Sequence, residues 1–165
     1  MKSLRIALCA FLTLAATAVF AQSDAQKSFD KLKSLTGNWE GKGSNGQNLK
    51  VAFRQTAGGS ALMSEILGVE DMISMFHLDG NRLLMTHYCG AGNQPRMQAS
   101  MSPDGKTITF QFVDATNLAS PTAGHMVHLV ITMPDSDHHT EDWTFAQGDK
   151  EMKEHFDLTR SKAAL

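Results

Sequence analysis

The chain has 165 residues, with 15 Lys and Arg against 17 Asp and Glu and a formal net charge of −2. A chain of this length can bury the core of one globular domain, and we see no repeat, low-complexity tract or linker that would divide it. The balanced charge, without a basic stripe, argues against nucleic acid as a partner.

The first 21 residues have the pattern of a secretory signal peptide. Two basic residues precede an apolar run over 6–20, and residues 19–21 place small side chains at a cleavage site. The run is short for a membrane-spanning helix, and no second candidate follows. We therefore expect a secreted or periplasmic protein with one mature domain, 22–165, and no transmembrane segment. Cys89 would then be the only thiol, which excludes an internal disulfide.

The mature chain is predicted to begin with a short helix over 24–35. Apolar side chains recur there at three-residue spacing: Phe29, Leu32 and Leu35. Ser23 or Asp24 can cap this helix, and Gly37 can end it.

Turn sequences recur at short intervals after the helix. They occupy 43–46, 57–60, 79–80, 103–106 and 147–149. An Asp-Gly pair between alternating runs is a strong hairpin signal. We expect an all-β fold, an antiparallel meander barrel of roughly eight to ten strands, because closure removes exposed strand edges.

The hairpin over 72–89 shows which side chains are expected inside. With Asp79-Gly80 as its turn, its uncharged and more apolar face carries Met72, Ser74, Phe76, Leu78, Leu83, Met85, His87 and Cys89. We assign this face to the interior, although a one-residue slip in register would reverse it. Tyr88 and Arg82 fall on the opposite face.

Further along the chain, an apolar face is expected from Val127, Leu129, Ile131 and Met133. The polar stretch 134–142, which includes His138 and His139, is expected to be a solvated hairpin loop. His155 is expected to face outward.

The segment 85–96 concentrates reactive side chains beside a glycine-rich loop, and loops at strand ends often carry binding groups. Three interpretations stay open. His87 with Tyr88 or Arg96 contacts a small molecule at the barrel mouth. Alternatively, His87 and Cys89 ligate a metal or haem iron. In the third interpretation, the histidine and cysteine only pack in the core.

Methionine is frequent, with 10 in the chain. Its flexible, polarizable side chain suits an adaptable apolar cavity, although ordinary core filling is the alternative. The inward-facing Met72, Phe76 and Met85 therefore join the candidate ligand-binding residues.

The order of a helix, Gly37-Asn38-Trp39, a meander of strands and a final Arg160 resembles the lipocalin and calycin superfamily. The continuation 39–43 is similar to nitrobindin-like and uncharacterised secreted bacterial lipocalin-like domains. The resemblance implies that Trp39 packs beneath Arg160 and closes one end of the barrel, aided by a cation–π contact. Nitrobindin-type barrels hold haem through a histidine, for which His87 and His155 are candidates outside any specific motif. Many lipocalins carry disulfides, and this chain departs from them.

We find no hydrolase, metalloprotease or phosphate-loop motif, and we assign no catalytic residue. The expected function is binding of a small hydrophobic or amphipathic ligand. The alternatives are a haem- or metal-binding barrel that uses His87 and an enzyme acting on a small ligand inside the barrel. A buried carboxylate beside His87 would favour the enzyme. Oligomeric state is not specified.

Overall fold

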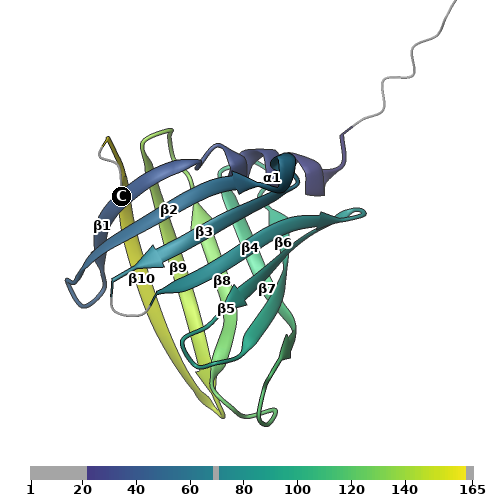
Figure 1. Cartoon of the computed structure of the whole chain (residues 1–165), viewed down its shortest axis with the longest axis vertical. Coiled ribbons are helices and arrows are strands. Elements are labelled where there is room, and N and C mark those ends of the chain that lie inside the picture. Colours follow the sequence, from purple (N-terminus) through teal and green to yellow (C-terminus); the bar gives the residue numbers. More distant parts are fainter. Residues whose placement is uncertain (1–21, 69–70, 163–165) are drawn as a thin grey trace, which may run out of the picture.

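The computed structural model describes residues 22–68 and 71–162, and the predicted signal peptide lies outside these ranges. Within them the chain forms one short α-helix, one 3₁₀ turn and ten strands (Figure 1). In chain order these are α1 (Asp24–Lys33), β1 (Gly37–Gly43), β2 (Asn48–Thr56), η1 (Ala57–Gly59), β3 (Ala61–Leu67), β4 (Met72–Asp79), β5 (Arg82–Tyr88), β6 (Gln94–Met101), β7 (Thr107–Thr116), β8 (His125–Thr132), β9 (His138–Gln147) and β10 (Lys150–Ser161). None of the described helices is long and apolar enough to cross a bilayer.

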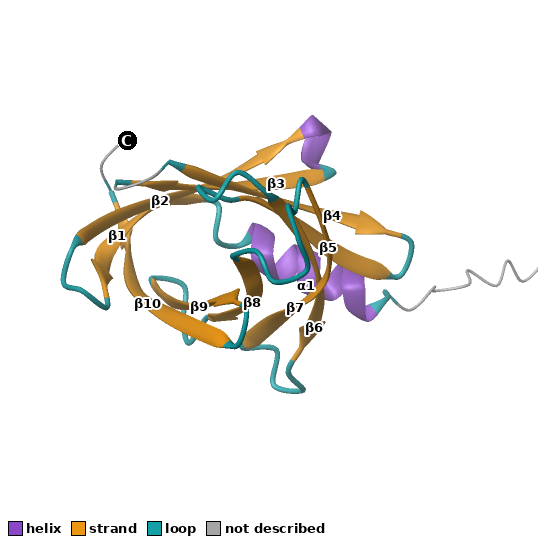
Figure 2. Ribbon diagram, turned by 90° about the horizontal axis from the view of Figure 1, so that it is seen from below, coloured by secondary structure: helices purple, strands orange, loops and turns teal. Residues whose placement is uncertain are grey.

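The strands form a closed barrel. Each pairs antiparallel with its neighbours in sequence, and β1 closes the ring by pairing with β10. Trp39 lies opposite Arg160 in that last pairing, so the two ends of the barrel sequence meet there. Figure 2 shows the barrel viewed along its axis, with α1 lying across the far end. The predicted all-β meander barrel is confirmed.

Helix α1 covers one end of the barrel. Ser23 caps it, as predicted, by accepting a hydrogen bond from the Gln26 N–H at 3.2 Å. The helix ends at Lys33, two residues before the predicted end, because the chain turns there and buries Leu35 in the core. Gly37 has a φ of +131°, and a Cβ at this position would lie 2.9 Å from Arg160 Nη1. Glycine therefore permits both the backbone turn and the close approach of the arginine.

The β4–β5 hairpin has the predicted faces but a different turn. Asp79 pairs with Arg82, so the turn residues are Gly80 and Asn81 and not Asp79-Gly80. The pairing thus moves by two residues, which preserves the side of the sheet on which each side chain lies. The inward face is buried at Ser74, Phe76, Leu83, Met85 and His87.

A bulge in β8 changes another predicted face. The register with β9 shifts between Met126 and His128, so Val127 has no opposite partner. An extra residue on one strand reverses the alternation at that point. Met126 therefore lines the barrel interior in place of Val127, while Leu129 and Ile131 are buried as predicted.

The prediction of a solvated loop over 134–142 is wrong for residues 138–142, which form a strand. Strand β9 begins at His138, and the next residue, His139, is 0% exposed. Glu141 is 1% exposed. The polar composition concealed a strand whose alternate side chains point into the core.

Candidate functional site

The barrel has an open end opposite α1, where five hairpin connections meet, from β1–β2 to β9–β10. A pocket of about 170 Å³ lies inside this end. It is lined by Gln47, Leu49, Ile66, Met72, His87, Met126, Trp143, Glu154 and Phe156. A larger hollow of about 460 Å³ lies outside the barrel, between α1 and the β6–β7 turn, but its lining is mostly polar. The interior pocket has the apolar walls with few polar groups that are typical of ligand sites.

His87 places an open ring nitrogen in the wall of this pocket. It lies near the end of β5 opposite Ser74 of β4, and the two side chains share a hydrogen bond of 2.9 Å between Nδ1 and Oγ. The ring is 0% exposed, and Nε2 has no hydrogen-bond partner among the described residues. Burial lowers the pKa of His87 to about 4, so the imidazole is neutral at neutral pH. Nε2 is therefore a donor in one tautomer and an acceptor in the other.

Trp143 forms the neighbouring part of the wall. Its ring centroid lies 4.9 Å from that of His87, with the planes tilted by 44°. The indole Nε1–H donates to Glu141 Oε2 at 2.9 Å, so the polar edge of the ring is already used. The remaining surface that Trp143 offers to the pocket is aromatic.

Glu141 continues this polar network toward the closed end. Its other oxygen, Oε1, lies 3.2 Å from His139 Nε2, and both residues are buried. The His139 and Trp39 rings lie perpendicular to each other, with centroids 4.3 Å apart. A buried carboxyl is tolerated when its oxygens are hydrogen-bonded, and both oxygens of Glu141 have such partners.

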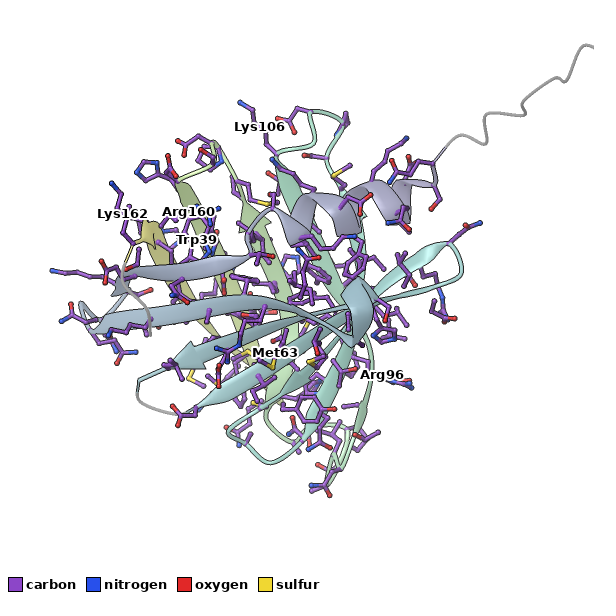
Figure 3. The ribbon with its side chains drawn as sticks, turned by 45° about the horizontal axis from the view of Figure 1, so that its top comes forward. Trp39, Met63, Arg96, Lys106, Arg160 and Lys162 are labelled. Carbon is purple, nitrogen blue, oxygen red and sulfur yellow. The ribbon has the colours of Figure 1, made fainter. Side chains whose placement is uncertain are left out.

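Trp39 and Arg160 meet at the closed end (Figure 3). The Arg160 guanidinium lies 4.2 Å from the Trp39 ring centroid. It also donates to the backbone oxygens of Ser34, Thr36 and Ser136 at 2.9–3.0 Å. The arginine thus ties β10 to the segment between α1 and β1 and to the β8–β9 connection.

The other predicted site residues lie in three different environments. Met72 lines the pocket with His87, whereas Phe76 and Met85 are cross-strand partners buried in the core. Tyr88 is 49% exposed on the outer face. Arg96 projects outward, paired with Asp114 (Figure 3).

The proposed metal pair is not extended by other ligands in the described part of the chain. Cys89 is half-buried at the start of the β5–β6 loop, and its backbone N–H donates to Asn93 O. Within residues 22–68 and 71–162, no three His, Cys, Asp or Glu side chains are grouped so that they could hold a metal ion.

Four polar or aromatic residues were missed in the sequence: His139, Glu141 and Trp143, which are buried, and Glu154, which is half-buried at the pocket wall. The first three alternate along β9, and a strand pattern of His-x-Glu-x-Trp would have placed them on one face. The preceding Pro-Asp-Ser-Asp turn made the segment look solvated. Glu154 could have been found from its two-residue spacing from Phe156.

Comparison with known proteins supports the fold alone. No protein-family model and no curated protein matches the chain. The crystal structure of Rv2717c from M. tuberculosis is similar, with a TM-score of 0.56 and 17% identity, over 82% of this chain and 98% of that chain. At this identity the likeness establishes a shared β-barrel architecture, and membership of the lipocalin and calycin superfamily stays a prediction.

Proposed function

We propose that the barrel binds a small, mainly apolar molecule in the pocket at its open end. The observation that carries this proposal is His87 Nε2, which has no hydrogen-bond partner among the described residues and lies in a mostly apolar wall. Leaving a buried polar atom without a hydrogen bond costs about 1–3 kcal/mol. A ligand group that pairs with Nε2 recovers that free energy, so the nitrogen favours a ligand with one polar group.

The volume of the pocket limits the size of the ligand. An engineered apolar cavity of about 150 Å³ holds benzene, and the present pocket is about 170 Å³. A molecule with one ring, or a short branched chain, matches this space. The flexible side chains of Met72 and Met126 in the wall allow modest adjustment.

Haem binding through His87 is the second candidate. An imidazole whose Nδ1 is held by Ser74 and whose Nε2 is open has the arrangement of an axial ligand. The volume of the pocket weighs against haem, because a macrocycle of four linked pyrrole rings is much larger than benzene. We therefore place a ring-sized ligand first.

An enzyme inside the barrel has less support. His87 bonds to Ser74, and Glu141 bonds to Trp143 and His139, so among the described residues no carboxylate is hydrogen-bonded to His87. General acid–base catalysis by a histidine commonly uses such a partner.

Native mass spectrometry of residues 22–165, purified gently and compared with the denatured protein, tests the proposal. Met126→Trp places a larger side chain in the pocket lining and should block the pocket. Met63→Trp is the control, because Met63 is half-buried on the outward face of β3 and does not line the pocket. We expect a ligand mass on the wild type and on Met63→Trp that is lost from Met126→Trp. Equal occupancy in both variants would overturn the proposed site. A haem mass, with an absorbance band that His87→Phe abolishes, would make haem the ligand.

If native mass spectrometry shows only the bare polypeptide, the protein is titrated with benzyl alcohol and the titration is monitored by NMR. The Trp143 indole lines the pocket and the Trp39 indole lies at the closed end, so their two N–H signals report on different parts of the barrel. We expect benzyl alcohol to shift only the Trp143 signal. No shift at millimolar concentration would refute ligand binding in this pocket.

We also propose that the protein is exported and that residues 1–21 are removed. The basic and apolar pattern of those residues supports this. The mass of protein recovered from the native envelope fraction tests it. A chain that begins at Gln22 is expected, and a full-length chain in the cytoplasm would contradict export.

A further inference from the structure

We propose that the ligand carries a protonated amine, which is received by the carboxylate of Glu154 and the aromatic face of Trp143. This inference rests on the proposed function and names the chemical class of the ligand.

The charge of the pocket wall favours a cation over an anion. His87 and Glu154 are the two ionisable side chains in the lining, and neither Lys nor Arg from the described residues joins them. Burial keeps His87 neutral at neutral pH. An anionic ligand would therefore meet a carboxylate without a compensating cation, whereas an ammonium group would meet its opposite charge.

The Glu154 carboxylate is held in place. Its Oε1 accepts a hydrogen bond from the Ser44 N–H at 3.0 Å, which leaves Oε2 without a hydrogen-bond partner among the described residues. Gly43 makes room for it, because a Cβ at position 43 would lie 2.8 Å from Oε1. Residues at the end of β1 thus position a side chain of β10 at the pocket wall, with one oxygen open.

Aromatic surface lies beside this carboxylate. Glu154 is the direct cross-strand partner of Trp143, so their side chains lie on the same face of the sheet. Trp143 already donates its N–H to Glu141, and so it presents its ring to the pocket. Phe156, two residues along β10 from Glu154, lines the same pocket. A cation is attracted to the face of tryptophan, and aromatic side chains recur in sites for ammonium ligands.

The rest of the wall accommodates an apolar body. Leu49, Ile66, Met72 and Met126 supply apolar side chains, and Gln47 completes the lining. His87 packs against the same indole that adjoins Glu154, so its open Nε2 is a second polar contact for the ligand. The combination fits a small aromatic or aliphatic amine.

Three probes of nearly equal size test this inference: benzylamine, benzyl alcohol and benzoate, which at neutral pH are a cation, a neutral molecule and an anion. Each is titrated into residues 22–165 while NMR follows the Trp143 indole N–H, with the Trp39 signal as the internal reference. A hydrogen bond to a charged partner is stronger than one between neutral groups, and solvent screening removes part of that gain. We expect benzylamine to bind about five- to thirtyfold more tightly than benzyl alcohol, and benzoate to bind least.

Two variants of β10 distinguish a specific role of Glu154 from a general effect of charge. Glu154→Gln keeps an oxygen for the Ser44 N–H and removes the charge, so benzylamine should then bind no better than benzyl alcohol. Glu151→Gln removes an exposed charge of the same strand and should leave the preference intact.

The outcomes separate the two proposals. If none of the probes shifts the Trp143 signal, the proposed function itself fails. If benzyl alcohol or benzoate binds as tightly as benzylamine, or if Glu154→Gln leaves the preference unchanged, the pocket stands and the amine inference is overturned.

Discussion

Mild acid should destabilise this barrel through His87. Burial lowers its pKa to about 4 in the folded chain, against an ordinary value of 6.5. Between these two values the unfolded chain binds a proton that the folded chain excludes. The free energy of unfolding therefore falls as the pH falls from 6.5 toward 4, and His87 contributes no pH dependence above that range.

The size of the effect follows from the two pKa values. One pKa unit corresponds to about 1.4 kcal/mol, so the full loss below pH 4 is about 3 kcal/mol. The linkage relation gives a loss of about 1.4 kcal/mol at about pH 5.5 and about 2.5 kcal/mol at about pH 4.5. Since many domains are stable by only about 5–15 kcal/mol, this is a measurable fraction.

The loss of stability caused by His87 is measured by urea unfolding of the wild type and of His87→Phe. Both proteins are unfolded with urea at neutral pH, about pH 5.5 and about pH 4.5. Carboxylates and the remaining histidines titrate in both proteins, so the difference between their unfolding free energies isolates His87. We expect the variant to become more stable relative to the wild type as the pH falls, by about 1.4 kcal/mol at about pH 5.5 and about 2.5 kcal/mol at about pH 4.5. The same difference at all three pH values would refute the burial argument, and the NMR titration of the His87 ring protons would then show an ordinary pKa.

Three further substitutions test the packing around the pocket and the closed end. Arg160→Met removes three hydrogen bonds to carbonyl oxygens and the contact with Trp39, and should lower the unfolding free energy by about 2–4 kcal/mol in urea. Gly41→Ala places a Cβ 1.8 Å from a backbone oxygen of β10 and should cost about 3 kcal/mol or prevent folding, measured by circular dichroism. Ser74→Ala leaves Nδ1 of His87 unpaired and should cost about 1–3 kcal/mol in thermal unfolding.

Matched variants define the results that would contradict these expectations. Arg82→Met breaks an exposed pair with Asp79 and should cost less than about 1 kcal/mol, so an equal loss for Arg160→Met would refute its role in closure. Gly46→Ala meets nothing within 4 Å and should cost about 1 kcal/mol for its positive φ, well below the cost at Gly41. Ser74→Ala should be nearly neutral in a His87→Phe background, and a full cost there would exclude the proposed pairing.

Local chemistry in the sequence determined the class of fold and the faces of some hairpins. Turn residues at regular intervals and period-two alternation indicate antiparallel strands without knowledge of distant partners. The faces of β4 and β5 were predicted correctly although the turn was misplaced, because a shift of two residues preserves the side on which each side chain lies. The position of His87 in the interior followed from this local parity.

The bulge in β8 depends on the partner strand and was not visible locally. The alternation of Val127, Leu129 and Ile131 is regular in the sequence, and only the pairing with β9 shows that Val127 is skipped. Met126 enters the pocket as a result. A bulge arises from the fit between two strands, so one strand alone does not specify it.

The polar interior likewise required the closed barrel. His139 and Glu141 are residue types that usually face solvent. Here they are buried because Glu141 forms hydrogen bonds with both His139 and Trp143. Glu154 is positioned by Ser44, which is 110 residues away in the chain. Alternation assigns a side chain to one face of its strand, but only closure of β1 against β10 brings these distant groups together in one site.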